Sequence, residues 1–172
     1  MQKIILVGYM AVGKTKIAHL LSEKTGFKRV DIDKLIENKI NLSVSEIFKQ
    51  KGEIFFRKTE HEVFREVVES NENLIISTGG GTPCYADNHL LLNGGNVISV
   101  YLKASIATIL KRLGSSKKER PLVADKSTAE LKEFVAKHLF ERSYFYNQAA
   151  FTISVDDKKK EAVADEIMAL LH

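Results

Sequence analysis

Residues 8–15, GYMAVGKT, have the types and spacing of a phosphate-binding loop, G-x-x-x-x-G-K-[ST]. The glycines would let the backbone curl so that several N–H groups point at phosphate oxygens. Lys14 would bring a compact charge to the β- and γ-phosphates, and the Thr15 hydroxyl could coordinate Mg²⁺. An apolar run precedes the motif and a helical pattern follows it, which favours this interpretation over an ordinary glycine-rich turn. The sequence therefore predicts a site for a nucleoside triphosphate with magnesium.

Two carboxylates, Asp31 and Asp33, follow the second apolar run. Alternation along a strand would place them on the same side of the chain. The carboxyl ends of the strands form the ligand crevice in an open α/β sheet, so one acid could serve a metal and the other an acceptor hydroxyl. Asp33 is, taken alone, equally credible as the N-cap of a helix that begins at Lys34.

Three successive glycines, Gly79, Gly80 and Gly81, follow the apolar run 74–77. Such a run is costly in conformational entropy, and a turn alone rarely needs it. It would let the backbone approach a small ligand closely and leave N–H groups free to bind that ligand.

Two arginines fall on predicted helices. Arg57 lies near the border of an apolar face, where Glu60 could pair with it, and Arg142 lies late in a long amphipathic helix. Each arginine alone favours a structural role. Both converging on one pocket would suit a carboxylate, because a guanidinium group binds it bidentately.

The segment 114–126 is polar, charged and interrupted by Pro121. It fits a plain surface loop or, in a phosphotransferase, a lid that excludes water from the reaction. Arg120 lies in this segment, where closure could bring it onto the phosphates.

Composition predicts one globular domain, since the chain has 172 residues, of which 44% are hydrophobic and 28% charged. No apolar stretch approaches the roughly 20 residues of a membrane span. The single cysteine, Cys84, has no evident His partner, so we expect it to be inert and the protein to be cytoplasmic. The net charge of +4 favours anionic substrates over nucleic acid, because no base-stacking aromatic motif accompanies the basic runs.

Apolar runs alternate with helical patterns, which predicts βαβ units and a parallel sheet. Ser43 and Glu46 form a predicted capping box. The expected strands are 3–7, 29–32, 73–78, 96–102 and 151–155, and the expected helices are 14–25, 34–39, 44–51, 54–69, 87–92, 106–113, 128–148 and 160–171.

Taken in order, these motifs resemble the shikimate kinase family over nearly the whole chain. The resemblance depends on the phosphate-binding loop, Asp31-x-Asp33, Gly52-Glu53…Phe56-Arg57…Glu60, Gly79-Gly80-Gly81, Arg120-Pro121-Leu122 and Glu141-Arg142…Tyr146. It implies a nucleoside-monophosphate-kinase-like α/β P-loop NTPase fold, with a five-stranded parallel sheet flanked by helices, a substrate-binding helical region at about 33–61 and a lid at about 114–126. It also implies transfer of the ATP γ-phosphate to the 3-hydroxyl of shikimate, on the pathway to chorismate and the aromatic amino acids.

The resemblance also implies roles for individual residues. Asp33 would bind the acceptor hydroxyl and take its proton, while Arg120 would stabilise the transferring phosphoryl group. Thr15 would hold one Mg²⁺ per subunit, with Asp31 acting through water. The shikimate site would comprise Asp33, Arg57, Gly79, Gly80, Gly81 and Arg142, and the ATP site Ala11, Val12, Gly13, Lys14, Thr15, Lys16, Arg112, Arg120 and Lys158.

The sequence departs from the family at Ala11, where a glycine is usual, and has Thr15 where serine is common. The alternatives are another small-molecule P-loop kinase such as a gluconate kinase, an ATP-gated regulator or GTPase-type switch, and a basic nucleic-acid-binding module. No Asn-Lys-x-Asp segment supports a GTPase. We expect a monomer that binds shikimate and ATP and neither nucleic acid nor a membrane.

Overall fold

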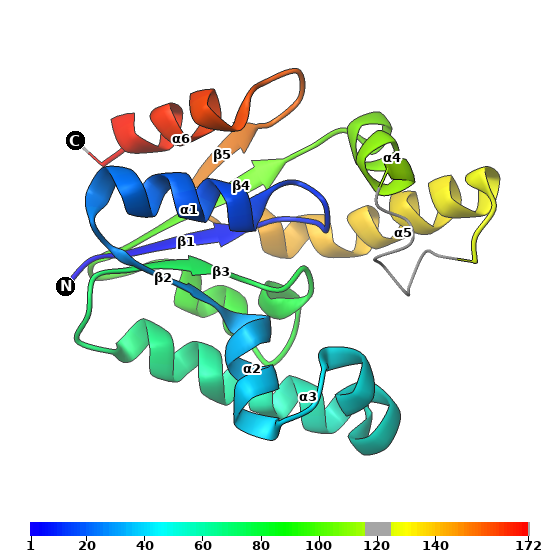
Figure 1. Ribbon diagram of the computed structural model, residues 1–172, viewed down its shortest axis with the longest axis horizontal. Coiled ribbons are helices and arrows are strands. Elements are labelled where there is room, and N and C mark those ends of the chain that lie inside the picture. The colour runs from blue at the N-terminus through cyan, green and yellow to red at the C-terminus, as the bar shows by residue number, and fades with distance from the viewer. Residues whose placement is uncertain (116–124, 172) are drawn as a thin grey trace.

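The computed structural model describes residues 1–115 and 125–171 and contains a five-stranded parallel sheet (Figure 1). The strands lie in the order β2-β3-β1-β4-β5, all parallel, which confirms the predicted fold class. Their bounds are β1 Lys3–Val7, β2 Lys28–Asp31, β3 Leu74–Ser77, β4 Val97–Lys103 and β5 Phe151–Ser154.

The central strand β1 is buried along its whole length, which explains its continuous apolar sequence after Lys3. It pairs with β3 on one side and β4 on the other, so that Ile4 faces Ile75 and Ile98 in register. Because these strands are parallel, the loops that follow them emerge at one edge of the sheet.

Helices cover both faces of the sheet. α1 (Lys14–Thr25) and α6 (Lys160–Ala169) lie on one face, and α3 (Val44–Glu69) lies on the other (Figure 1). α4 (Ile106–Ser115) and the first part of α5 (Thr128–Tyr146) extend beyond the carboxyl ends of the strands. None of the helices in the described ranges combines the length and apolarity that crossing a membrane requires.

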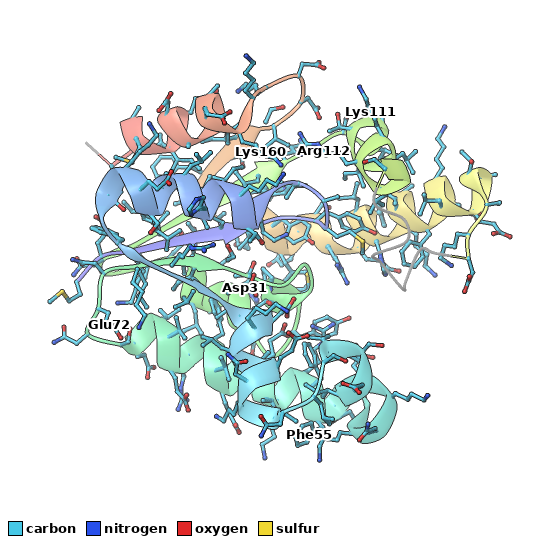
Figure 2. The ribbon with its side chains drawn as sticks, in the orientation of Figure 1. Asp31, Phe55, Glu72, Lys111, Arg112 and Lys160 are labelled. Atoms are coloured by element: carbon cyan, nitrogen blue, oxygen red, sulfur yellow. The ribbon has the colours of Figure 1, made fainter. Side chains whose placement is uncertain are left out.

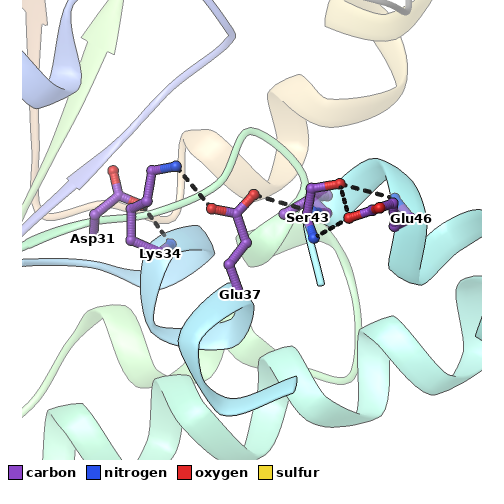
Figure 3. A network of polar contacts seen from close by, with 6 residues as sticks. Asp31, Lys34, Glu37, Ser43 and Glu46 are labelled. Carbon is purple, nitrogen blue, oxygen red and sulfur yellow. Dashed lines mark hydrogen bonds and ion pairs between the residues drawn. The ribbon is translucent and has the colours of Figure 1, made fainter. Parts of the chain in front are cut away.

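A chain of polar contacts joins α2 (Ile32–Ile40) to the start of α3 (Figure 3). Lys34 Nζ donates to Glu37 Oε2 at 2.7 Å, and Glu37 Oε1 accepts from the Val44 amide at 3.0 Å. Ser43 and Glu46 then form the predicted capping box, which is confirmed. These contacts fix the helical segment that follows β2.

Gly52 divides α3 into two helical parts, as the two separate predicted helices 44–51 and 54–69 anticipated. Its φ of 84° and ψ of 169° lie in a region that only glycine occupies readily. The kink sets the direction of the second part, which carries Arg57 and Glu60.

Two local predictions are wrong. Asp33 does not cap a helix beginning at Lys34, because α2 begins at Ile32 and its N-cap is Asp31, whose Oδ1 accepts from the Lys34 amide at 3.2 Å. The expected helix at 87–92 is a 3-10 helix, η2 (Asn88–Leu92), which follows a shorter one, η1 (Thr82–Cys84). Most of the predicted lid, including Arg120, lies outside the described residues.

We expect Gly52→Ala to lower the free energy of unfolding by about 1–3 kcal/mol, because alanine would be strained in this conformation. No atom lies within 4 Å of the added Cβ, so the cost would be conformational rather than steric. Urea denaturation would measure it. Gly114→Ala is the matched control, since Gly114 is equally open but lies inside α4, where alanine should stabilise by up to ~1 kcal/mol. Equal effects of the two substitutions would contradict this interpretation.

Candidate active site

A cleft of about 580 Å³ opens where the loops after β1, β2 and β3 meet. Most of the predicted site residues line it, although the loops that carry them are far apart in sequence. Its walls comprise Met10, Ala11, Gly13, Lys14, Thr15, Lys16, Asp31, Asp33, Thr78, Gly79, Gly80, Arg112, Ser115 and Lys160.

The loop between β1 and α1 has the backbone conformation that its glycines allow. Gly8 and Gly13 have φ values of 149° and 101°, and Gly13 occupies the N-cap of α1 without any side-chain cap. The first amides of α1 therefore lack a side-chain cap and can bind an anion. Ala11 also has positive φ, 66°, which explains why glycine is favoured at this position. Lys14 Nζ donates to the carbonyls of Gly8 and Tyr9 at 2.6 and 2.9 Å.

Further cations surround this loop. Arg112 donates from Nη1 to the carbonyls of Ala11 and Val12 at 3.2 and 3.0 Å, so it contacts the loop directly. Figure 2 shows Lys160 beside Arg112, and both side chains line the cleft. Lys158, which the family resemblance placed at the ATP site, pairs with Glu166 at 2.8 Å and does not line the cleft. The basic run 158–160 was visible in the sequence, but the start of α6 decides which lysine points inward.

Three oxygen-bearing side chains lie together between α1, β2 and β3. Thr15, Asp31 and Ser77 line a smaller cavity of about 220 Å³, and Asp31 and Ser77 are partners in the strand register. The Ser77 hydroxyl is buried and makes no hydrogen bond to a described residue. Within residues 1–115 and 125–171, no group of three or more His, Cys, Asp or Glu side chains is placed to hold a metal ion. The set fits Mg²⁺ nonetheless, because Mg²⁺ keeps several waters and binds through few protein ligands plus phosphates.

Asp33 lies in the first turn of α2, against the glycine run. A Cβ added at Gly79 would lie 2.9 Å from Asp33 Oδ1. Burial, reinforced by the nearby charges of Asp31 and Glu60 and opposed by Lys14, raises the pKa of Asp33 to about 6. A carboxyl group with such a pKa can accept a proton near neutral pH.

Arg142 faces the second glycine of the run. A Cβ at Gly80 would lie 3.1 Å from Arg142 Nη1, and the Gly80 carbonyl accepts from the Tyr146 hydroxyl at 2.6 Å. Tyr146 is buried, so α5 is fixed against the glycine run one turn beyond Arg142. Sequence reasoning quoted Tyr146 only as part of a motif and gave it no role.

Arg57 faces the third glycine. A Cβ at Gly81 would lie 2.9 Å from both terminal nitrogens of Arg57. Arg57 Nη1 donates to Glu60 Oε1 at 2.9 Å, which confirms the predicted pair, and its guanidinium carbon lies 3.8 Å from the centre of the Tyr85 ring. Glu60 is only 1% exposed and accepts from the Thr82 hydroxyl at 2.8 Å.

The three glycines thus serve a purpose that the sequence did not reveal. None of them has positive φ, so backbone conformation does not require glycine there. Each instead leaves space for one side chain: Gly79 for Asp33, Gly80 for Arg142 and Gly81 for Arg57.

The buried residue Tyr9 lies between Arg142 and Lys14. Arg142 lies 5.8 Å from the centre of the Tyr9 ring, while the Tyr9 carbonyl accepts from Lys14. The Tyr9 hydroxyl lies 3.1 Å from His138 Nδ1 in α5, and burial raises its pKa to about 12, so it stays neutral. Burial also raises the pKa of Cys84 to about 11, which keeps this thiol protonated and unreactive.

Comparison with known proteins gives a consistent picture. A family model described as shikimate kinase matches residues 10–172. A shikimate kinase of Flavobacterium psychrophilum is 52% identical over 99% of this chain and 99% of its own. The solved shikimate kinase of Bacteroides thetaiotaomicron has a TM-score of 0.92 at 33% identity, covering 99% of this chain and 98% of that one. That of Acinetobacter baumannii, in complex with shikimate, has a TM-score of 0.87 at 30% identity, covering 99% and 93%.

The raised pKa of Asp33 predicts a pH-dependent effect of Asp33→Asn on stability. Between about pH 4 and 6 the unfolded chain loses the Asp33 proton while the folded chain keeps it, so stability falls as pH rises through this window. Asparagine avoids this loss. Without nucleotide or magnesium, we expect the substitution to stabilise the protein by roughly 1–3 kcal/mol at pH 7.5 and by almost nothing at pH 4. Urea denaturation at both pH values would measure this, and a gain independent of pH would contradict the assigned environment.

Proposed function

The chain belongs to the shikimate kinase family, and we propose on this basis that it transfers the γ-phosphoryl group of ATP to the 3-hydroxyl of shikimate. The activity is that of a phosphotransferase of the shikimate pathway. Family membership favours shikimate over gluconate as acceptor, because the relatives that align over nearly the whole chain are shikimate kinases.

One observation supports the roles that we assign to the individual side chains. The glycine run that ends β3 faces Asp33, Arg142 and Arg57 in succession, and its first two glycines line the same cleft as Lys14. A base, two carboxylate-binding groups and a phosphate-binding loop therefore share one edge of the sheet. Such proximity suits phosphoryl transfer, in which positioning and charge stabilisation do most of the work.

The nucleotide phosphates would bind to the loop 11–16 and the uncapped start of α1. Lys14 would exchange its contacts with the Gly8 and Tyr9 carbonyls for contacts with phosphate oxygens. Thr15 and Asp31 would hold one Mg²⁺, Asp31 through water, and the unpartnered Ser77 hydroxyl could bind one of these waters. When bound, Mg²⁺ would neutralise charge on the β- and γ-phosphates. Arg112 would support the loop through its carbonyls.

The acceptor would be held by its carboxylate and presented by its hydroxyl. Arg57 and Arg142 provide guanidinium groups on the far side of the glycine run, and Glu60 fixes the rotamer of Arg57. The 3-hydroxyl would then face Asp33, whose pKa of about 6 suits it to accept the proton as the oxygen attacks the γ-phosphorus. The helical region 33–61 would form the acceptor side, and the segment 114–126 with Arg120 would close over the phosphates.

We further propose that one chain forms the whole site and acts as a monomer in the cytoplasm. Every group assigned above comes from the same chain, and its single cysteine is typical of a reducing compartment. Light scattering at micromolar concentration tests the first statement, which a stable dimer would contradict. Fractionation of cells producing the protein tests the second, which recovery outside the cytoplasmic fraction would contradict.

A coupled ADP-release assay with ATP and Mg²⁺ tests the proposed function. We expect ADP release that depends on shikimate, with at most background release when gluconate or no acceptor is present. The carboxylate of gluconate could reach the arginines, but its flexible chain would not hold a hydroxyl at Asp33. Release with gluconate alone would preserve the fold and replace the substrate, while ATP binding without any acceptor-dependent release would favour a regulator.

Asp33→Asn provides the test of the proton acceptor in the same assay. We expect shikimate-dependent release to fall by at least about 10²-fold, the usual contribution of a general base. ADP binding, measured by calorimetry, should change far less than turnover, because Asp33 is assigned to the acceptor hydroxyl and not to the phosphates. Near-normal turnover of the variant would refute the assigned role.

Gly81→Ala tests the arrangement of Arg57 without removing a charged group. The new Cβ would lie 2.9 Å from two guanidinium nitrogens, so Arg57 must move although Glu60 holds it. We expect the KM for shikimate to rise at least about tenfold, since small displacements of positioning groups carry large penalties, with the KM for ATP little changed. Gly26→Ala is the control, because Gly26 does not line the cleft and no described atom lies within 4 Å of its added Cβ, so any loss there would reflect backbone strain alone. An equal rise in both KM values would show a general loss of structure instead.

A further inference from the structure

Lys160, the first residue of α6, reaches the phosphate-binding loop from the C-terminal part of the chain. Its Cε and Nζ lie 3.1 and 3.7 Å from the position that a Cβ on Gly13 would take. The side chain therefore passes directly over the residue that opens α1, and it lines the cleft together with Lys14 and Lys16. Neither the loop motif nor the family resemblance singled out this lysine.

Lys160 lies among other cations, in surroundings that favour binding of an anion. Lys16 and Arg112 are its cationic neighbours, and burial together with these two charges lowers its pKa, while the adjacent Glu161 carboxylate opposes this shift. Within residues 1–115 and 125–171, no carboxylate lies within ion-pair distance of Lys160 or of Lys16. Gathering three cations without a carboxylate paired to Lys160 or Lys16 is unfavourable, and an anion bound among them would offset that cost.

Lys160 is also held in place rather than left on a mobile surface. The Asp156 carboxylate accepts from the Ser105 amide at 3.0 Å, and the Val155 amide donates to the Lys103 carbonyl at 2.9 Å. These bonds fasten the loop before α6 to the start of α4, the helix that carries Arg112. The backbone segments that carry Lys160 and Arg112 are therefore joined by hydrogen bonds. Figure 2 shows the two side chains next to each other at the cleft.

We propose that Lys160 binds the diphosphate of the nucleotide, the part that ATP and ADP share. The inference deepens the proposed function and rests on its nucleotide site. Lys14 contacts the beginning of the loop, at Gly8 and Tyr9, whereas Lys160 stands over its end, at Gly13. The two lysines thus approach the phosphates from opposite ends of the loop. A contact with the diphosphate persists through the reaction, so it stabilises substrate, transition state and product alike.

The test compares Lys160→Met, which keeps the aliphatic stem and removes the charge, with Lys160→Arg and Lys159→Ala. Lys159 is exposed and makes no side-chain cap at α6, so its variant controls for loss of a surface charge. Calorimetry would measure the Kd of ADP and of adenosine, and thermal unfolding would verify the fold of each variant.

We expect Lys160→Met to raise the Kd of ADP at least about tenfold, the usual scale for one charge-assisted contact, and to leave that of adenosine within about twofold. Lys160→Arg should restore most of the ADP affinity. The KM for ATP should rise by the same factor as the Kd of ADP, with kcat nearly unchanged, as expected for uniform binding.

A rise of less than about threefold in the Kd of ADP would overturn the inference, and so would an equal effect of Lys159→Ala, which would indicate a general charge effect. A parallel loss of adenosine affinity would place Lys160 at the nucleoside and overturn it too. The ADP measurement does not need turnover, so it separates this inference from the proposed function. Unchanged ADP binding by Lys160→Met would overturn the inference alone, whereas an unmodified protein that bound no ADP would overturn the proposed function as well.

Discussion

Burial of β1 between β3 and β4 is the constraint on which the site depends. The strand is inaccessible on both faces, as its continuous apolar sequence requires, and it pairs along its length with β3 on one side and β4 on the other. The phosphate-binding loop follows β1, the glycine run follows β3, and the helix with Arg112 follows β4. The segments that follow these strands therefore meet because the three apolar strands pair. Contacts between the segments themselves are not needed to bring them together.

Charge is distributed unevenly across the cleft that results. The nucleotide side gathers Lys14, Lys16, Arg112 and Lys160 around one loop, whereas the acceptor side confines two arginines by packing. Glu60 holds Arg57 with a buried carboxylate, whose second oxygen accepts a hydrogen bond from Thr82 and so offsets part of the cost of burying the pair. Asp33 lies between the two sides in a poorly solvated position. Cationic side chains therefore line the cleft in charged form, while burial keeps Asp33, the proposed proton acceptor, at a raised pKa.

The sequence predicted the order of the elements and the phosphate-binding loop because both depend on local patterns. Hydrophobic periodicity located the five strands, and Gly52 separated two helical patterns. Features that depend on packing between elements distant in sequence could not be predicted in this way. Alternation along a strand was invoked to bring Asp31 and Asp33 together, yet Asp33 lies in a helical turn. The glycine run was expected to let a ligand approach the backbone and to leave amides free; the structure adds that the run leaves room for side chains from α2, α3 and α5. The family resemblance placed Lys158 at the ATP site, whereas Lys160, two residues further along the same basic run, is the lysine that lines the cleft.

Tyr9 has a consequence for anyone who would redesign this protein. Its ring supports Arg142 on the acceptor side, and its carbonyl binds Lys14 on the nucleotide side. Reshaping the acceptor pocket around Arg142 to admit a larger or uncharged alcohol would displace the Tyr9 ring and, through its backbone, the lysine beside it. Changes of acceptor specificity and of nucleotide affinity are therefore mechanically linked. A directed-evolution library that varies one pocket while holding the other constant would leave out the compensating substitutions that it needs.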